Sequence, residues 1–192
     1  MLIVVRHGRT EANAAGLLQG RRLDPGLDEV GRRQAAALAA ALPEVAAVVA
    51  SPLRRAQETA AAFGLPVTVD ERWTELDYGA LDGTPLADVA PEIWATWRSD
   101  TGFTLPDGES LLDLGRRVRA AADDLAAEAA ERDVVVVTHV SPIKASVAWA
   151  LGVGDEIAWR AFVAPGSITR IACGPRPSLH AFNVTAHFDD LA

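Results

Sequence analysis

The stretch Leu2-Ile3-Val4-Val5-Arg6-His7-Gly8-Arg9-Thr10 decides how the chain is expected to fold. It begins with four consecutive apolar residues and then changes abruptly to basic and polar ones. A short apolar run of this kind is typical of a strand that is buried on both faces of a parallel sheet. Ligands of such sheets bind outside the carboxyl ends of the strands. Arg6 and His7 are therefore expected at a functional edge of the sheet.

Similar apolar strands recur along the chain, and helices separate them. Strands are predicted at 45–50 and 134–138, and helices at 28–42, 53–63, 111–131 and 143–151. Residues 167–172 and 179–184 are predicted to add strands at or near an edge of the sheet. Apolar strands that alternate with helices indicate an α/β fold. We predict a three-layer α/β/α sandwich with a mostly parallel central sheet.

Length and composition indicate one ordinary globular domain. The 192 residues are close to the typical domain size of about 150 residues, so a single domain over 1–192 is expected. The irregular stretch 78–110, rich in Gly, Pro, Asp and Trp, is predicted to form a cap over the site. Cys173 is the only cysteine, which excludes an intramolecular disulfide and a cysteine-rich zinc cluster.

Charge and hydropathy narrow the expected partners. The formal net charge of −8 argues against nucleic acid or an anionic membrane as a general partner. No apolar run approaches the roughly 20 residues that a membrane span needs. The apolar run before Arg6 is too short for a signal peptide, so a cytoplasmic location is expected. A homodimer is left open.

Two strand-to-helix junctions share the dipeptide Ser-Pro, at Ser51-Pro52 and Ser141-Pro142. Serine is a favourable N-cap and proline suits the first helical turn, so a helix is expected to begin at each dipeptide. Helix N-termini favour bound anions. Three strand ends thus bring candidate side chains to one edge: Arg6 and His7, Arg54 and Arg55, and His139.

These residue types suit the chemistry of a phosphoryl group. Arginine binds phosphate oxygens in a bidentate manner, and a neutral imidazole is a competent nucleophile. Glu75 is the first candidate for a proton donor, with Glu109 and Asp77 as competing carboxylates. An arginine in the first turn of a helix opposes the helix dipole unless an anion compensates it. This favours Arg54 as a site residue, and its neighbour Arg55 is expected at the surface.

Five segments, in order, resemble the histidine phosphatase superfamily, also called the phosphoglycerate mutase-like family. They are Arg6-His7-Gly8 with Thr10-Glu11 and Asn13, Ser51 to Ala60, Glu75-Leu76-Asp77-Tyr78-Gly79 leading to Asp82-Gly83, Pro106-Asp107-Gly108-Glu109-Ser110, and Thr138-His139. The resemblance covers essentially the whole chain. It implies the fold predicted above and a phosphomonoesterase that acts on a small phosphorylated metabolite.

The resemblance also implies roles for individual residues. His7 would be the phosphorylated nucleophile, and Arg6, Arg54 and His139 would surround the phosphoryl group. Glu75 would protonate the leaving oxygen and then activate water. Three further residues would contact the substrate: Asn13, Gln19 and Gly20. No metal and no cofactor are implied.

Other functions remain open at this stage. A cofactor-dependent phosphoglycerate mutase would need extra cations after the acid motif, where the chain has only Arg98. A non-catalytic phosphoryl-binding module would be expected to lack His7 or Glu75. A protein phosphohistidine phosphatase often lacks a cap. Val140 replaces the family's usual glycine, and the run His139 to Lys144 is similar to α-ribazole phosphatase-like domains fused to ribonuclease H in actinobacteria.

Several remaining polar and aromatic residues have simpler interpretations. Ser110 is predicted to be the N-cap of the helix at 111–131, with Asp113 completing a box-like pattern. His180 and His187 are expected to be structural. Trp73, Trp94 and Trp97 surround the predicted cap and favour core packing, with an apolar leaving-group pocket as the alternative.

Overall fold

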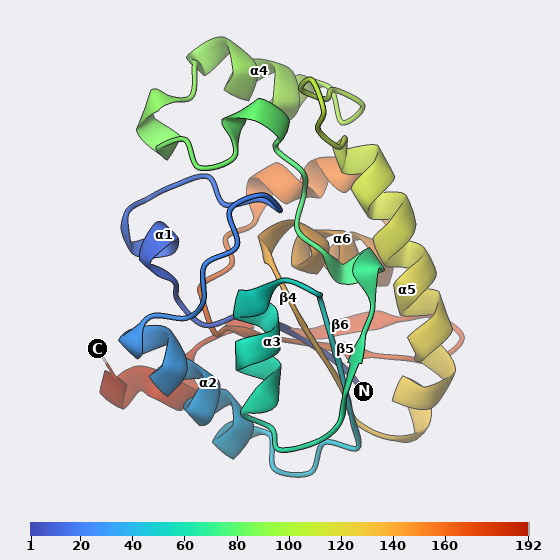
Figure 1. Cartoon of the computed structure of the whole chain (residues 1–192). Coiled ribbons are helices and arrows are strands. Elements are labelled where there is room, and N and C mark those ends of the chain that lie inside the picture. Colours follow the sequence, from blue (N-terminus) through green and yellow to red (C-terminus); the bar gives the residue numbers. More distant parts are fainter. Residues whose placement is uncertain (192) are drawn as a thin grey trace.

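A mixed sheet lies at the centre of the computed structural model, which describes the backbone of residues 1–191 and the side chains of residues 1–188 (Figure 1). Within this range the strands are β1 (Leu2–Arg6), β2 (Ala47–Ala50), β3 (Val67–Val69), β4 (Val134–Thr138), β5 (Ile168–Ala172) and β6 (Ser178–Val184). Their order in the sheet is β3-β2-β4-β1-β5-β6. The first four are parallel, whereas β5 and β6 are antiparallel to their neighbours. The predicted, mostly parallel sheet is confirmed.

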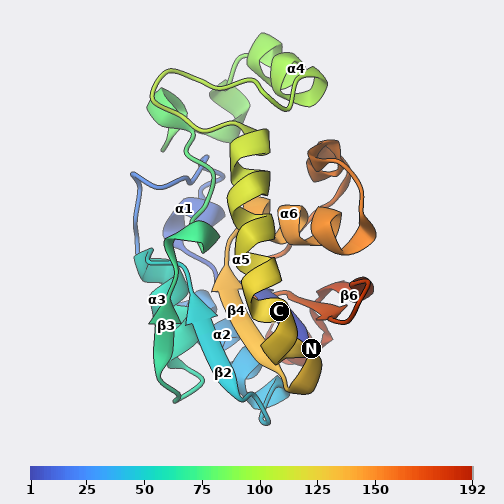
Figure 2. The ribbon, with the colours of Figure 1, turned by 90° about the vertical axis from the view of Figure 1, so that its right-hand side faces the viewer.

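Helices cover both faces of this sheet, as Figures 1 and 2 show. They are α1 (Glu11–Ala14), α2 (Glu29–Ala41), α3 (Arg54–Ala61), α4 (Pro91–Ser99), α5 (Leu111–Glu131) and α6 (Val140–Leu151). Side chains of β1 alternate between the faces. Ile3 and Val5 belong to the core cluster with α2 and α3, whereas Leu2 and Val4 belong to the one with α5 and α6. The three-layer prediction is therefore confirmed.

The long helix and the late strands agree closely with the sequence. Helix α5 has the predicted bounds, and its N-cap is Ser110, whose Oγ accepts a hydrogen bond of 3.1 Å from the amide of Asp113. Strands β5 and β6 lie at the predicted late segments and form one side of the sheet. Strong apolar periodicity and local capping suffice to locate such elements.

The two Ser-Pro junctions differ from the prediction. Helix α6 begins at Val140 with His139 as its N-cap, and α3 begins at Arg54 with Leu53 as its N-cap. Neither serine is a helix cap. Ser51 instead bonds to the ring of His139, with Oγ 2.7 Å from Nε2. The Ser51 side chain therefore contacts a distant segment, although local capping rules predict that it caps a helix.

Residues 78–110 lie beyond the carboxyl ends of β2 and β4, whose arrows point towards α4 in Figure 2. The stretch contains α4 and two short 3₁₀ helices, η2 (Gly79–Leu81) and η3 (Leu86–Asp88). Its helix α4 was not predicted, and neither was the short, largely exposed strand β3. Trp97 is buried in a cluster with Trp94 and Phe103, whereas Trp73 belongs to the main core. Core packing is thus the role of Trp73 and Trp97.

The loop that follows β1 packs tightly against the start of α2. A Cβ atom at Gly8 would collide with the carbonyl oxygen of Gly31, and one at Gly31 with that of Arg9. The amide of Asp28 also donates to the carbonyl of Arg9 at 3.0 Å. Glycine at both positions therefore lets two backbones approach at the residues that immediately follow His7.

Replacing Gly31 by alanine is expected to lower the free energy of unfolding by about 1–3 kcal/mol, because overpacking costs more than the gain in helix propensity. Gly174→Ala is the matched control, since a Cβ there would meet no atom within 4 Å. Urea unfolding of both variants measures the difference. Equal midpoints for the two variants would contradict the close packing at Gly31.

Candidate active site

His7 lies directly after β1 and is almost completely buried, at 2% exposure. Its Nδ1 is 2.7 Å from the carbonyl oxygen of Gly8. A carbonyl only accepts hydrogen bonds, so Nδ1 carries the proton and Nε2 presents a lone pair. Burial, followed by the positive charges of Arg55 and Arg6, lowers the pKa of His7 well below its ordinary value. At neutral pH the ring is therefore uncharged.

His139 lies beside His7, and their ring centroids are 5.1 Å apart. Arg55 donates from Nε to Nδ1 of His139 at 3.2 Å, so Nε2 of His139 carries the proton and donates to Oγ of Ser51 at 2.7 Å. Burial, followed by the charge of Arg55, lowers the pKa of His139 well below its ordinary value. Both imidazoles are therefore neutral and have opposite tautomers.

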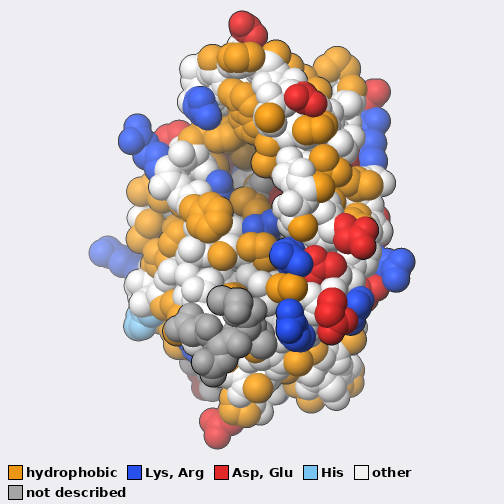
Figure 3. All heavy atoms as spheres, turned by 90° about the vertical axis from the view of Figure 1, so that its left-hand side faces the viewer, with side chains coloured by type: hydrophobic (Ala, Val, Ile, Leu, Met, Phe, Trp, Pro, Cys, Tyr) orange, Lys and Arg blue, Asp and Glu red, His pale blue; other side chains and the backbone are white. Residues whose placement is uncertain are grey.

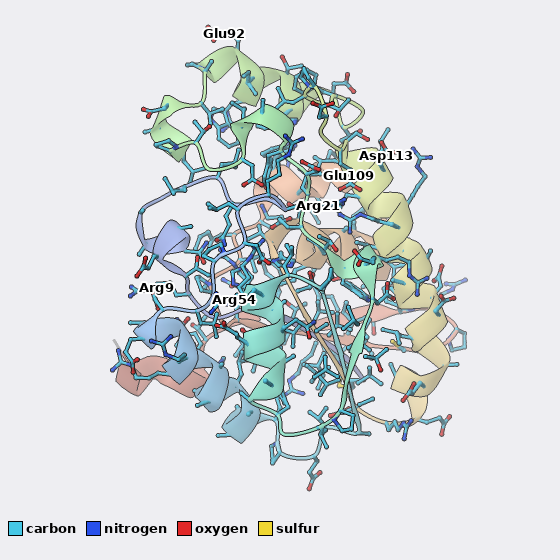
Figure 4. All side chains as sticks on the ribbon, viewed as in Figure 1. Arg9, Arg21, Arg54, Glu92, Glu109 and Asp113 are labelled. Atoms are coloured by element: carbon cyan, nitrogen blue, oxygen red, sulfur yellow. The ribbon has the colours of Figure 1, made fainter. Side chains whose placement is uncertain are left out.

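The structure places Arg55, and not Arg54, among these residues, which corrects the sequence prediction. The Arg55 side chain is fully buried and donates to the carbonyl of Gly20 at 2.8 Å and to that of Leu23 at 3.2 Å. Arg54 is exposed and forms an ion pair of 2.7 Å with Glu58; Figure 4 labels it on α3. The effect of the helix dipole is similar for two adjacent arginines, so it could not predict which of them lies beside the histidines.

A signal in the sequence could have made this distinction. Arg54 and Glu58 are four residues apart and oppositely charged, a pattern that is typical of an exposed helix face. Ala56 and Ala60 have the same spacing, are small and apolar, and lie on the buried face together with Arg55. The hydrophobic pattern of α3 therefore indicates the buried arginine.

Arg6 has a different environment from Arg55, because it lines the cavity described below. One of its terminal nitrogens donates to the carbonyl of Val163 at 2.7 Å. Its Nε is buried and has no partner among the residues that the structure describes. Burial lowers the pKa of Arg6 to about 10, so the group stays charged at neutral pH. Arg6 therefore retains a charged donor for an anion.

Glu75 is buried, and its carboxylate lies at the N-terminus of α6. Its oxygens accept hydrogen bonds from the amides of Val140 at 3.0 Å, Ser141 at 3.1 Å and Leu76 at 2.7 Å. The first turn of a helix is a favourable position for a carboxylate. The side chains of His7 and Glu75 line the same cavity.

The two competing carboxylates are engaged elsewhere. Glu109 accepts from Arg21 at 2.7 Å and from Arg117 at 2.7 and 2.8 Å; Figure 4 shows Arg21 and Glu109 side by side. Asp77 accepts from the amide of Gly79 at 2.9 Å. Neither carboxylate lines the cavity. Glu75 is therefore the only one of the three candidates that lines the cavity.

Glu109, Arg21 and Arg117 form a cluster that also holds the backbone of Glu75. Arg21 donates from Nε to the main-chain carbonyl of Glu75 at 2.7 Å, and Arg117 reaches the same oxygen at 3.3 Å. Because Glu109 holds both guanidinium groups, it fixes the backbone of Glu75 indirectly. Sequence analysis did not identify Arg21 or Arg117, since no local pattern links them to Glu75.

The three predicted substrate-contacting residues differ in their positions. Asn13 and Gln19 line the cavity, and the side-chain nitrogen Nδ2 of Asn13 donates to Oε1 of Gln19 at 3.0 Å. The Nε2 of Gln19 is buried and has no partner among the described residues. Gly20 is not part of the lining: its amide donates to Asp82 at 2.8 Å and its carbonyl accepts from Arg55. Gly20 therefore positions Arg55 instead of contacting the cavity.

A cavity of about 450 Å³ connects these groups with the segment 78–110. Tyr78, Leu86 and Trp94 from that segment line it together with Trp159 and Phe162. Figure 3 shows hydrophobic side chains around a hollow on this face of the molecule. The cavity thus has a polar end at His7 and Glu75 and an apolar remainder, as expected for a small-molecule site.

Within residues 1–188, no group of three or more His, Cys, Asp or Glu is arranged to hold a metal ion. In the same part of the chain, no helix is both long and apolar enough to cross a membrane.

Comparison with known proteins identifies the family. Residues 2–185 match the model of the histidine phosphatase superfamily (branch 1), and the chain belongs to this family. It is 41% identical over 169 residues to the bifunctional protein Rv2228c of Mycobacterium tuberculosis, covering 83% of this chain and 46% of that protein. The chain therefore spans about half the length of this relative.

Two further relatives match along most of their length. One is a probable phosphoglycerate mutase GpmB of Yersinia enterocolitica, 32% identical over 98% of this chain and 94% of that protein. The other is the structure of the mycobacterial glucosyl-3-phosphoglycerate phosphatase Rv2419c with VO3. It has a TM-score of 0.85 and 32% identity, and the match covers 96% of this chain and 98% of that one. The fold is thus phosphoglycerate mutase-like.

The placement of the two arginines gives a matched experiment. Arg55→Gln is expected to weaken binding of inorganic phosphate roughly 10- to 100-fold, because a charged group beside both histidines is removed. Arg54→Gln is expected to change the affinity less than threefold, since Arg54 is exposed and paired with Glu58. Isothermal calorimetry measures both affinities. A larger loss for Arg54→Gln would restore the original assignment.

Proposed function

We propose that the protein is a phosphomonoesterase that hydrolyses a small phosphorylated metabolite through a phosphohistidine on His7. One observation carries this proposal: Nδ1 of His7 is bound to Gly8, and Nε2 accepts no hydrogen bond from the described residues while the ring lines the cavity. The nucleophilic atom is therefore available, and Glu75 lies on the same cavity. Homology to a phosphatase of the same fold supports the reaction class.

In the first half-reaction, Nε2 of His7 attacks the phosphorus atom while the bond from phosphorus to the ester oxygen breaks. Glu75 gives its proton to the departing oxygen, so the alcohol leaves in neutral form. Arg6 and the unpartnered amide of Gln19 supply donors for the phosphoryl oxygens. The charge of Arg55 lies behind the two rings and stabilises negative charge on the transferring group.

In the second half-reaction, Glu75 is a carboxylate and accepts a proton from water as the water oxygen attacks phosphorus. The bond between phosphorus and Nε2 breaks, inorganic phosphate leaves, and His7 and Glu75 return to their starting states. Glu75 can serve in both steps because backbone amides of α6 and Leu76 hold it in one place. No further group is needed to balance the protons.

A phosphoglycerate mutase activity is the second candidate, because the GpmB relative bears that name. Such an enzyme would need several extra cations after the acid motif to hold a second anionic group while the phosphoryl group moves. The segment 78–110 contributes Tyr78, Leu86 and Trp94 to the cavity and no cation, while Arg98 is exposed over the ring of Trp94. Hydrolysis is therefore favoured. Release of inorganic phosphate, compared with phosphoryl transfer to added 3-phosphoglycerate, distinguishes the two.

The finer assignments from sequence are proposals as well. Similarity to one part of a protein called bifunctional supports the comparison with phosphatase domains that occur in fusions. We also propose a single capped domain, a cytoplasmic location and a small phosphorylated substrate without nucleic acid or membrane partners. The net charge of −8 and the cavity volume support these proposals.

His7→Ala is expected to lower phosphate release from p-nitrophenyl phosphate at least 1,000-fold, because the covalent route is lost. The wild-type protein, quenched in denaturant at alkaline pH during turnover, should carry an acid-labile phosphoryl group that the variant lacks. Mass spectrometry of the quenched protein measures this group. A variant that retained a tenth of the wild-type rate would contradict the mechanism.

Glu75→Gln keeps the size of the side chain but cannot transfer a proton. It is expected to slow hydrolysis of alkyl phosphates at least tenfold more than that of p-nitrophenyl phosphate, whose phenolate leaves without full protonation. Steady-state rates on both substrates measure this ratio. Asp77→Asn is the control, since Asp77 does not line the cavity. Equal losses on both substrates would assign proton transfer to another group.

A further inference from the structure

Lys144 is the only lysine of the chain, and it lines the cavity. It lies on α6, four residues after Val140, whose amide holds the carboxylate of Glu75. Residues with this spacing lie on one helix face, about 5–6 Å apart. Val140, Ser141 and Lys144 thus form one wall of the cavity. The ammonium group donates to the carbonyl of Ala158, which lines the same cavity.

The charge of Lys144 has no ion-pair partner among the described side chains. Its Nζ donates to the carbonyl of Ala158 at 2.6 Å, and no carboxylate of residues 1–188 forms an ion pair with it within 4.0 Å. By contrast, the half-buried guanidinium groups of Arg21 and Arg117 are both paired with Glu109. A partly buried cation without a counter-ion is costly, because it loses hydration without gaining an ionic partner.

Lys144 and Arg6 lie in different electrostatic surroundings, although both line the cavity. Burial lowers the pKa of Lys144, and the charge of Glu75 partly offsets this effect. Arg6 and Lys144 are the only cations among the lining residues, and Arg6 belongs to the phosphoryl end. The walls around the apolar end include Leu86, Trp94 and Phe162. Lys144 is thus the one cation of the lining that is left for the alcohol part of a substrate.

We propose that Lys144 is a specificity-determining residue that pairs with a carboxylate on the alcohol part of the substrate. This inference rests on the proposed hydrolysis of phosphomonoesters. One ammonium neutralises one negative charge, which matches a carboxylate; a second phosphate dianion would need additional cations that the lining does not contain. Two N–H groups remain on Nζ after its bond to Ala158, and they suit the two oxygens of a carboxylate.

The spacing along α6 also limits the length of the substrate. The ester oxygen must lie near Glu75, and the carboxylate must reach an ammonium group whose backbone position is one helical turn from Val140 and whose Nζ is bound to Ala158. We infer that a carboxylate two or three carbon atoms from the ester oxygen meets this condition. The inferred substrate class is therefore a small phosphorylated hydroxy acid, with room beside Trp94 and Phe162 for a larger apolar substituent.

Two matched phosphate esters test this inference. 3-Phosphoglycerate and glycerol 3-phosphate have the same skeleton and differ in a carboxylate against a hydroxymethyl group. The wild-type protein is expected to prefer 3-phosphoglycerate at least tenfold in kcat/KM. Lys144→Met, which keeps the length of the side chain, should reduce this preference to less than threefold, mainly through KM. Arg98→Met, which removes an exposed cation outside the cavity, should retain the preference.

Direct binding separates this inference from the proposed function. In the His7→Ala background, calorimetry with the same two esters requires no turnover. A preference for 3-phosphoglycerate that Lys144→Met or Lys144→Gln abolishes would support the carboxylate site even if the wild-type protein released no phosphate. Equal affinities for the two esters, or a preference that survives both substitutions, would overturn it. Absence of phosphate release from every ester would instead refute the hydrolase.

Discussion

The hydrogen bond from the amide of His7 to the carbonyl of Thr138, at 2.9 Å, extends the parallel pairing of β1 with β4 by one residue. Arg6 pairs with Thr138 at the ends of the two strands. The residue that follows each strand is a histidine, so the two rings lie side by side. Parallel pairing in register thus brings together residues that are 132 positions apart in the chain. The arginines and the cavity are arranged around this pair.

The arginines beside the two histidines carry the positive charge of the site, whereas both histidine rings are neutral. Burial lowers the pKa of both imidazoles, and Arg55 contributes to both shifts. Arg6 remains a cation although burial lowers its pKa to about 10. The result is a neutral nucleophile next to permanent positive charge, which suits attack on an anionic phosphate ester. A protonated His7 could not attack.

The sequence alone indicated a mostly parallel sheet, most of its strands and helices, and a set of candidate site residues. Apolar runs located β1 and β4, and the change to polar residues at their ends identified His7 and His139. Glu75 was instead singled out as a candidate proton donor, with Glu109 and Asp77 as alternatives. The strands could be located because burial on both sheet faces leaves a local pattern of consecutive apolar residues, and strand ends follow directly from it.

Only the tertiary structure decided which of the candidate side chains meet. Arg55 replaces Arg54 because α3 packs its alanine face, and Arg55 with it, towards His139. Glu109 is engaged by arginines from two distant segments, which leaves Glu75 for the cavity. Within residues 1–188, Lys144 forms no ion pair within 4.0 Å, and only the packing of distant segments around α6 decides this. The partners of a polar side chain depend on contacts between segments far apart in sequence, and no local pattern records them.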